Sequence, residues 1–323
     1  MHLNDSFRDI FVPLHGEQAA AMAAEAYARM NGLGCALVTT GPGGTNAMTG
    51  LACAWVDSIP VLFISGQVTI NSLSTGQRQR GIQETNITAL VESQTKYAVI
   101  LWDEKDIRYE LEKAVHIARK ERPGPVWIDI PLDIQSKQVN WDELDGYTPQ
   151  PAIASDAMPV IGERPLLVIG NGVHLAHAAV DCRKLVDHLG IPVVSSWAGA
   201  DIIPTAHPLY IGRFGIFGDR AANFAVQNAK SILVLGSRLS IPQTGYRVEL
   251  FARGARITMV DQSLTETQKF PFQVTPIIAD VGDVIRGMLE MPWPYVNPDW
   301  REKCQAWKVH YPVLLGETRE SSV

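Results

Sequence analysis

Short apolar runs alternate with helical stretches over the first 130 residues. The runs predict strands at residues 9–14, 35–39, 60–65 and 126–130. The helical periodicity predicts helices at residues 17–31, 43–56 and 103–120, with a polar loop at 69–81. Strands that are apolar throughout and alternate with helices are typical of a parallel sheet covered on both faces. The helix at 17–31 is apolar nearly all round, which predicts burial between two layers.

The alternation stops at a polar, proline-containing stretch, residues 136–163, and then restarts. Strands are predicted at residues 165–169, 192–195, 231–235 and 256–260. Helices are predicted at residues 176–189, 219–227 and 281–290, with a short one at 300–307. We therefore expect an α/β chain of two doubly wound parallel-sheet domains. The predicted parts are domains at 1–140 and 165–292, a linker at 141–164 and a tail at 293–323.

Length and composition limit the classes of protein that fit. A chain of 323 residues suits about two domains, and 46% hydrophobic with 19% charged residues indicates a globular protein. A net charge of −6 provides no basic field, so we do not expect a nucleic-acid partner. There is no run long enough to span a bilayer and no signal peptide, which favours the cytoplasm. The four cysteines and the histidines have no metal-site spacing.

Glu17 stands where the chain enters the alanine-rich helix at 17–31. One interpretation is electrostatic, because a carboxylate in the first turn interacts favourably with the helix dipole by about 0.3–1 kcal/mol. The other is chemical: a carboxylate against small apolar surface should have a raised pKa from desolvation and could hydrogen-bond a protonated ring nitrogen. Position alone favours the electrostatic interpretation.

Two further segments gain meaning from their order. Residues 38–46 take a strand through Gly41-Pro42-Gly43-Gly44 into a helix, which could be a tight turn or an anion site made by backbone N–H groups. It is not a Walker loop, because no Gly-Lys-Ser/Thr follows. Residues 81–85 would pass, in isolation, for an ordinary helix start.

Together these segments resemble the thiamine diphosphate-dependent enzymes of the acetolactate synthase type. Six motifs occur in the family's order, at residues 17–29, 37–46, 55–67, 81–84, 95–97 and 122–131. Nearly the whole chain takes part. The resemblance implies that residues 1–140 are a pyrimidine-binding domain and residues 165–292 the family's middle domain. It also implies a transferase or lyase acting on 2-oxo acids, with a place in branched-chain amino acid biosynthesis.

The resemblance also implies roles for particular residues. In the family, the glutamate at the Glu17 position hydrogen-bonds the pyrimidine ring nitrogen of the cofactor and favours the imino tautomer that deprotonates the thiazolium carbon. Thr39, Pro42 and Asn46 would line the pyrimidine pocket, and Gln83 would face the thiazolium and the substrate. The family usually has a histidine directly before the glutamate. Here that position is Gly16, so His15 is expected to be structural.

The middle domain offers weaker signals for a second cofactor. Gly170-Asn171-Gly172 follows a strand but lacks the third glycine of a dinucleotide fingerprint. Some members of the family bind FAD or ADP on this domain, but Gly236-Ser237-Arg238 is not followed by the acidic pair of the FAD-binding synthases. FAD is therefore disfavoured. Asp261, at a strand end, could meet a ribose or cap a turn.

The family binds the cofactor diphosphate through Mg²⁺ on a third domain, whose Gly-Asp-Gly signature is absent from this sequence. Family members also have a strand and a helix before the position of Asp5. These departures predict a fragment or one part of a split enzyme, inactive as an isolated chain, with the diphosphate-binding domain in cis or in trans. A homodimer is expected. The rival hypotheses are a non-catalytic nucleotide-binding or assembly protein and, resting only on Gly170 and Gly172, an NAD-dependent dehydrogenase.

Overall fold

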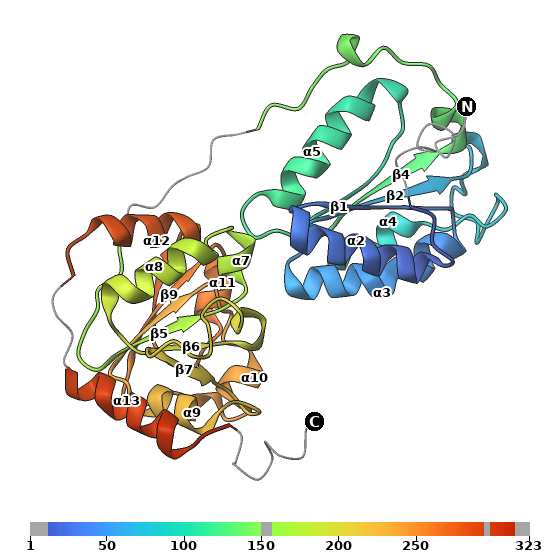
Figure 1. Cartoon of the computed structure of the whole chain (residues 1–323). Helices are drawn as coiled ribbons and strands as arrows, with labels where there is room; N and C mark the ends of the chain where they lie inside the picture. The colour runs from blue at the N-terminus through green and yellow to red at the C-terminus, as the bar shows by residue number, and fades with distance from the viewer. Residues whose placement is uncertain (1–11, 150–156, 294–297, 314–323) are drawn as a thin grey trace. The chain divides into compact units, whose positions relative to one another are not determined.

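The computed structural model describes residues 12–149, 157–293 and 298–313. The chain divides between Ala152 and Ile153 into two compact units, each with its own sheet (Figure 1). The strand predicted at 9–14 is wrong in its described part, since residues 12–14 form no strand. Val12 is 80% exposed, and Pro13 has no N–H to donate to a sheet. Positions 9–11 lie outside the described residues.

The first unit is a parallel sheet with helices on both faces (Figure 1). Its strands are β1 (Gly34–Val38), β2 (Val61–Gln67), β3 (Tyr97–Ile100) and β4 (Val126–Pro131), in the order β1-β2-β4-β3. Its helices are α2 (Glu17–Asn31), α3 (Pro42–Asp57), α4 (Ile87–Val91), α5 (Ile107–Arg119) and α6 (Leu132–Gln135). The doubly wound α/β architecture predicted from the sequence is confirmed.

The two faces of this sheet are packed differently. On one face α5 covers alternate residues of the central strands, among them Leu62, Ile64 and Ile128. Phe63 and Trp127 have the other parity, and their rings stack with centroids 5.0 Å apart. Because side chains alternate along a strand, Ser65, Gln67 and Asp129 share the face of Phe63 and Trp127, toward which α3 and α4 pack.

Helices α2 and α3 approach each other through small residues. A Cβ atom at Gly50 of α3 would lie 2.5 Å from the Cβ of Ala21 in α2. The predicted burial of α2 between two layers is wrong. Only the alanine stripe Ala21, Ala24 and Ala28 is buried, and larger side chains such as Met30 face outward. The buried stripe is narrow because alanines alone fit so close a helix contact.

The second unit is a six-stranded parallel sheet of order β10-β9-β8-β5-β6-β7. Its strands are β5 (Pro165–Ile169), β6 (Val193–Ser195), β7 (Tyr210–Arg213), β8 (Ser231–Leu235), β9 (Arg256–Asp261) and β10 (Val274–Ile278). Its helices are α7 (Gly172–Leu175), α8 (Ala179–Leu189), α9 (Arg220–Asn228), α10 (Ile241–Thr244), α11 (Leu264–Gln268), α12 (Val281–Glu290) and α13 (Pro298–His310).

Two helix pairs cover the two faces of this second sheet. Helices α8 and α12 pack over one face, and α9 and α13 over the other (Figure 1). Trp300 of α13 is buried and its Nε1 donates to the Pro165 carbonyl over 2.8 Å, so this helix is part of the unit's core. Within the described ranges, no helix has the length and apolar character that a bilayer-spanning segment needs.

Candidate active site

Five residues singled out by the sequence line one cavity of about 570 Å³. Glu17, Thr39, Pro42, Asn46 and Gln83 are brought together there, along with Gly43 and Thr45. The cavity lies where α2 and α3 begin and where the loops after β1 and β2 pass. This is the carboxyl edge of the parallel sheet, the usual place for ligands in open α/β folds.

Glu17 and Asn46, which both line the cavity, are hydrogen-bonded to each other. Glu17 is the first residue of α2 and Asn46 lies in the second turn of α3, and the Asn46 Nδ2 donates to Glu17 Oε2 over 2.8 Å. This hydrogen bond is the largest influence on the carboxyl group and lowers the pKa of Glu17. The raised pKa expected from the sequence is therefore wrong, because the carboxylate is half-exposed and hydrogen-bonded rather than desolvated.

The glycine-rich loop touches the loop that carries Gln83. Gly41 has φ of 57°, and a Cβ atom at this position would lie 2.1 Å from the Gln83 carbonyl oxygen. Only glycine fits so close an approach in this left-handed conformation. Pro42 then begins α3 as its first residue, a position where its missing N–H costs nothing. Pro42, which follows Gly41, and Gln83 both line the cavity.

Gln83 itself has an uncommon backbone. Its φ is 60°, in the left-handed region that non-glycine residues rarely adopt and that is concentrated at functional sites. The neighbouring Glu84 accepts hydrogen bonds from the backbone N–H groups of Ser74, Arg80 and Gly81. A hydrogen bond from the Ser74 side chain, together with these backbone bonds, lowers the pKa of Glu84 to about 2. Glu84 therefore holds the loop together, a role that its place in the sequence did not indicate.

His15 precedes the site without entering it. The residue is exposed and does not line the cavity. Glu17 follows it by two residues and does line the cavity. Within the described ranges, no group of three or more His, Cys, Asp or Glu side chains could hold a metal ion.

Comparisons with known proteins identify the family of the chain. The model of the thiamine pyrophosphate enzyme N-terminal TPP binding domain matches residues 1–90, and the model of the central domain of the same enzymes matches residues 161–288. The chain belongs to the thiamine pyrophosphate enzyme family.

Acetolactate synthases are among the similar members of this family. The chain is 34% identical over 322 residues to acetolactate synthase 2 of Nicotiana tabacum, a match that covers 94% of this chain and 47% of the relative. It is 33% identical over 323 residues to acetolactate synthase of Arthrospira platensis, with 94% and 54% covered. For the large subunit from Corynebacterium glutamicum the identity is 35% over 286 residues, with 85% and 45% covered. The chain thus spans about half the length of these relatives.

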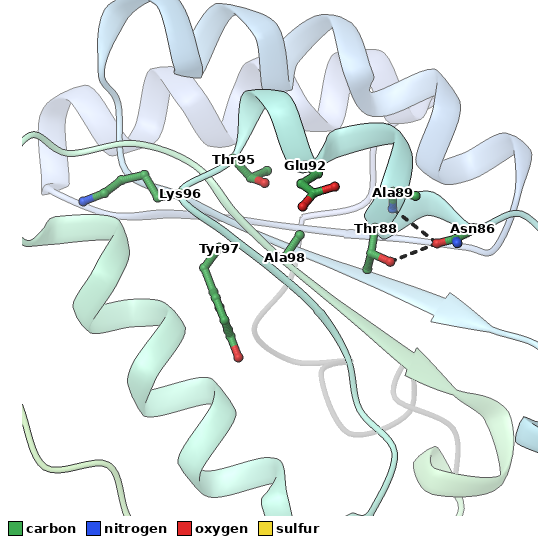
Figure 2. Close-up of a pocket in the computed structure, with 8 residues that line it drawn as sticks. All are labelled: Asn86, Thr88, Ala89, Glu92, Thr95, Lys96, Tyr97 and Ala98. Carbon is green, nitrogen blue, oxygen red and sulfur yellow. Dashed lines mark hydrogen bonds between the residues drawn. The ribbon is translucent and has the colours of Figure 1, made fainter. Parts of the chain in front are cut away.

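A second cavity, of about 430 Å³, lies in the first unit between α4 and β3. Several of its polar side chains bond to nearby parts of the chain, among them Asn86, whose bonds are drawn in Figure 2. Lys96 Nζ donates to the carbonyls of Ile117 and Lys120 at the end of α5, and Asn86 Oδ1 accepts from Thr88 and Ala89 at the start of α4. Burial lowers the pKa of Lys96 to about 8. These contacts satisfy polar groups at helix ends, and none of the five predicted site residues lines this second cavity.

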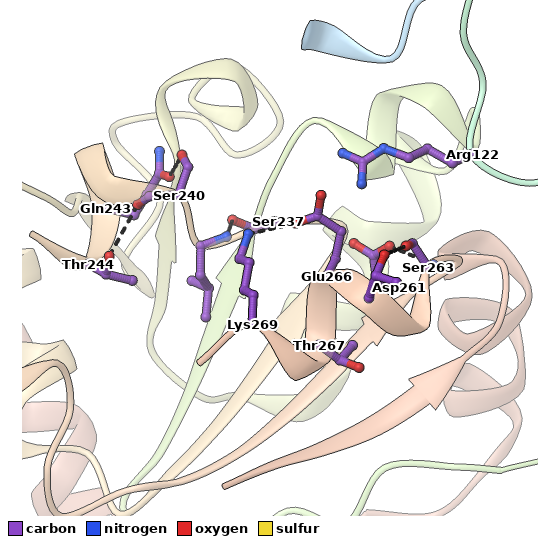
Figure 3. Close-up of polar contacts among 12 residues, drawn as sticks. Arg122, Ser237, Ser240, Gln243, Thr244, Asp261, Ser263, Glu266, Thr267 and Lys269 are labelled. Carbon is purple, nitrogen blue, oxygen red and sulfur yellow. Dashed lines mark hydrogen bonds and ion pairs between the residues drawn. The ribbon is translucent and has the colours of Figure 1, made fainter. Parts of the chain in front are cut away.

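The glycines of the central domain serve close packing. Cβ atoms at Gly170 and Gly172 would lie 2.5 Å and 2.6 Å from backbone atoms of Gly236. The turns after β5 and β8 therefore touch backbone to backbone, which accounts for the Gly-x-Gly pattern. Asp261 accepts from the Ser263 N–H over 2.8 Å where the chain enters α11, so this strand-end aspartate caps a turn (Figure 3).

Proposed function

We propose that this chain is the pyrimidine-binding and central part of a thiamine diphosphate-dependent carboligase or decarboxylase of 2-oxo acids. Acetolactate synthesis is the named activity nearest to it. The observation that supports the proposal is the meeting of Glu17, Thr39, Pro42, Asn46 and Gln83 around one cavity. These residues come from three separate segments of the sequence, and the fold gives them a common surface.

The cavity residues fit an aminopyrimidine. A volume of about 570 Å³ is in the range of small-molecule sites. Asn46 keeps the pKa of Glu17 low, so at neutral pH the carboxylate is an acceptor-only group. Such a group suits a protonated or N–H-bearing ring nitrogen. We propose that Glu17 and Asn46 orient the ring, that Thr39 and Pro42 line it, and that Gln83 faces the substrate.

This arrangement gives the cofactor and the chain different roles in the proposed reaction. When bound, the cofactor supplies the electron sink for breaking the bond between the carbonyl carbon and the carboxylate of a 2-oxo acid. The chain supplies orientation, and Glu17 holds the hydrogen-bonded proton at the ring nitrogen. The proposal includes a diphosphate-binding domain that holds Mg²⁺ and is supplied in cis or in trans. It also includes a homodimer and a cytoplasmic setting.

Thiamine itself is a suitable probe, because it carries the aminopyrimidine and needs no diphosphate site. We expect saturation-transfer NMR on the full chain to show transfer to the pyrimidine protons. Glu17→Gln should weaken binding about tenfold or more, since a hydrogen bond to a charged group contributes roughly 1.5–3 kcal/mol. Glu92→Gln, in the second cavity of the same unit, is the matched control and should leave thiamine binding unchanged.

Two results would overturn the proposal. One is equal thiamine binding by the chain and its Glu17→Gln variant. The other is binding of ADP or FAD with no binding of thiamine, which would favour the nucleotide-binding or assembly alternative. A second assay measures pyruvate turnover with thiamine diphosphate and Mg²⁺ after addition of the diphosphate-binding domain of a relative, and there Glu17→Gln should abolish turnover.

A further inference from the structure

Gln67 makes four hydrogen bonds at the end of β2. The side chain is 4% exposed. Its Nε2 donates to the Thr85 carbonyl over 2.8 Å and to Asp129 Oδ2 over 2.9 Å. Its Oε1 accepts from Thr40 Oγ1 over 3.1 Å and from the Val68 N–H over 2.9 Å. A side-chain amide has two N–H donors and two acceptor lone pairs, so its whole capacity is used.

The orientation of this amide is set by its backbone partners. The Val68 N–H can only donate and the Thr85 carbonyl can only accept, so Oε1 must face Val68 and Nε2 must face Thr85. The opposite orientation would lose both bonds and would also place a carbonyl oxygen against the Asp129 carboxyl group. Gln67 therefore has one orientation, and that orientation determines which groups on the neighbouring loops can bind to it.

Asp129 anchors Gln67 to the core of the sheet. The aspartate is fully buried on β4, opposite Ser65 of β2 in the strand register. Its Oδ1 accepts from Ser65 Oγ, which in turn accepts from Trp127 Nε1 over 2.8 Å. Trp127 is fixed by its stacking on Phe63. The chain of contacts thus runs from the stacked rings through Ser65 and Asp129 to the Gln67 amide.

We propose that Gln67, anchored by Asp129, is a positioning residue that fixes the two loops of the cavity relative to each other. Thr40 lies between Thr39 and the Gly41-Pro42 turn, and Thr85 lies two residues after Gln83. One amide therefore bonds both loops at once. The significance for catalysis rests on the proposed function, whereas the connection between the loops is a property of the chain itself.

The loops need such a connection because they touch closely. The Gly41 backbone approaches the Gln83 carbonyl so nearly that a Cβ atom would not fit between them. Gln83 also holds a left-handed φ of 60°, which persists only when its surroundings restrain it. Loss of the Gln67 bonds should let residues 81–86 move away from residues 39–46. The cavity between Pro42 and Gln83 would then lose its shape.

Hydrogen exchange measured by mass spectrometry on the full chain, without any ligand, tests the connection directly. Gln67→Met keeps an unbranched side chain of similar size and removes all four bonds. We expect peptides covering residues 39–46 and 81–87 to exchange about tenfold faster. Thr40→Val removes only the hydroxyl bond to Gln67 and should speed exchange in residues 39–46 by about threefold. This milder variant keeps the test decisive if Gln67→Met unfolds.

Two further variants separate positioning from general stability. Thr95→Val removes a buried hydroxyl that bonds the Val91 carbonyl in the same unit, and it should change neither peptide. Thr40→Ser keeps the hydroxyl and should restore wild-type exchange. Thiamine affinity by saturation-transfer NMR should follow the same order, weakened in Thr40→Val and restored in Thr40→Ser at equal melting temperature.

The outcomes distinguish this inference from the proposed function. Unchanged exchange of both peptides in Gln67→Met and Thr40→Val would overturn the positioning role, even if the chain binds thiamine. Faster exchange in a chain that binds no thiamine would support the connection between the loops and overturn the proposed function. Faster exchange with unchanged thiamine affinity in Thr40→Val would also count against positioning, because the connection would then not act on the cavity.

Discussion

Asp129 is a buried carboxyl group whose hydrogen-bonding neighbours are the neutral side chains of Ser65 and Gln67. Burial is the largest influence on it and raises the pKa of Asp129 from 3.8 to about 6, although both hydrogen bonds act in the opposite direction. At neutral pH the chain thus keeps an ionised group away from water, which destabilises the fold. A role in holding Gln67 gives a reason for its presence.

The sign of the pH dependence follows from the raised pKa. The folded state binds this proton more tightly than the unfolded state, so the stabilisation is fully present below pH 3.8 and is lost as the pH rises through 6. Asp129→Asn is neutral at every pH. We expect the free energy of unfolding of the first unit, wild type minus variant, to fall by about 3 kcal/mol across this window. Urea unfolding between pH 4 and 7 measures it, and a constant difference would contradict the assignment.

Residues of the candidate site divide into those that a pattern reveals and those that only the fold reveals. Glu17, Asn46 and Gln83 stand in motifs with a recognisable order, so the sequence was enough to single them out. Gln67 and Asp129 also stand in quoted motifs, but their contact joins two strands that are 62 positions apart. No local pattern encodes such a contact. The lowered pKa of Glu17 was missed for the same reason, because it depends on a donor 29 positions away.

At the scale of elements, the contact between α2 and α3 positions Glu17 beside Asn46. We expect Gly50→Ala to destabilise the first unit by about 1–3 kcal/mol, because the new methyl group would lie 2.5 Å from Ala21 Cβ and 2.8 Å from its backbone carbonyl carbon. Chemical denaturation measures this loss. Gly254→Ala is the control, since nothing lies within 4 Å of its Cβ position, and a change within about 0.5 kcal/mol is expected. Equal effects of the two substitutions would show that the helix contact tolerates a larger residue.

The elements with strong periodicity were predicted well. Helix α2, helix α12 and strand β8 have the bounds expected from the sequence. Strands β3, β7 and β10 were missed, and all three lie at sheet edges. An edge strand has a neighbour on one side only and needs no continuous apolar run. β10 contains a proline, which weakens the strand pattern, whereas the apolar run of β3 is present in the sequence and was overlooked.

For the whole molecule, each unit buries its own core, and the two should respond separately to core substitutions. Ile128→Ala in the first unit or Ile285→Ala in the second should each cost about 2–5 kcal/mol in its own unit. Fluorotryptophan NMR can follow Trp127 and Trp300, which are buried in the first and second units respectively. Each substitution should shift the unfolding transition of one signal only. A joint shift of both signals would indicate a single cooperative unit.

The Gln67 junction has a consequence for anyone who wishes to redesign the cavity. Thr40 and Gly41 on one loop and Gln83 and Thr85 on the other are coupled, so grafting either loop alone from another protein should fail even when its sequence is compatible with the fold. The two loops should therefore be exchanged together, with Gln67 retained to bond both of them. Positions on α3 such as Thr45 line the cavity without bonding Gln67, and single substitutions there should leave the two loops coupled.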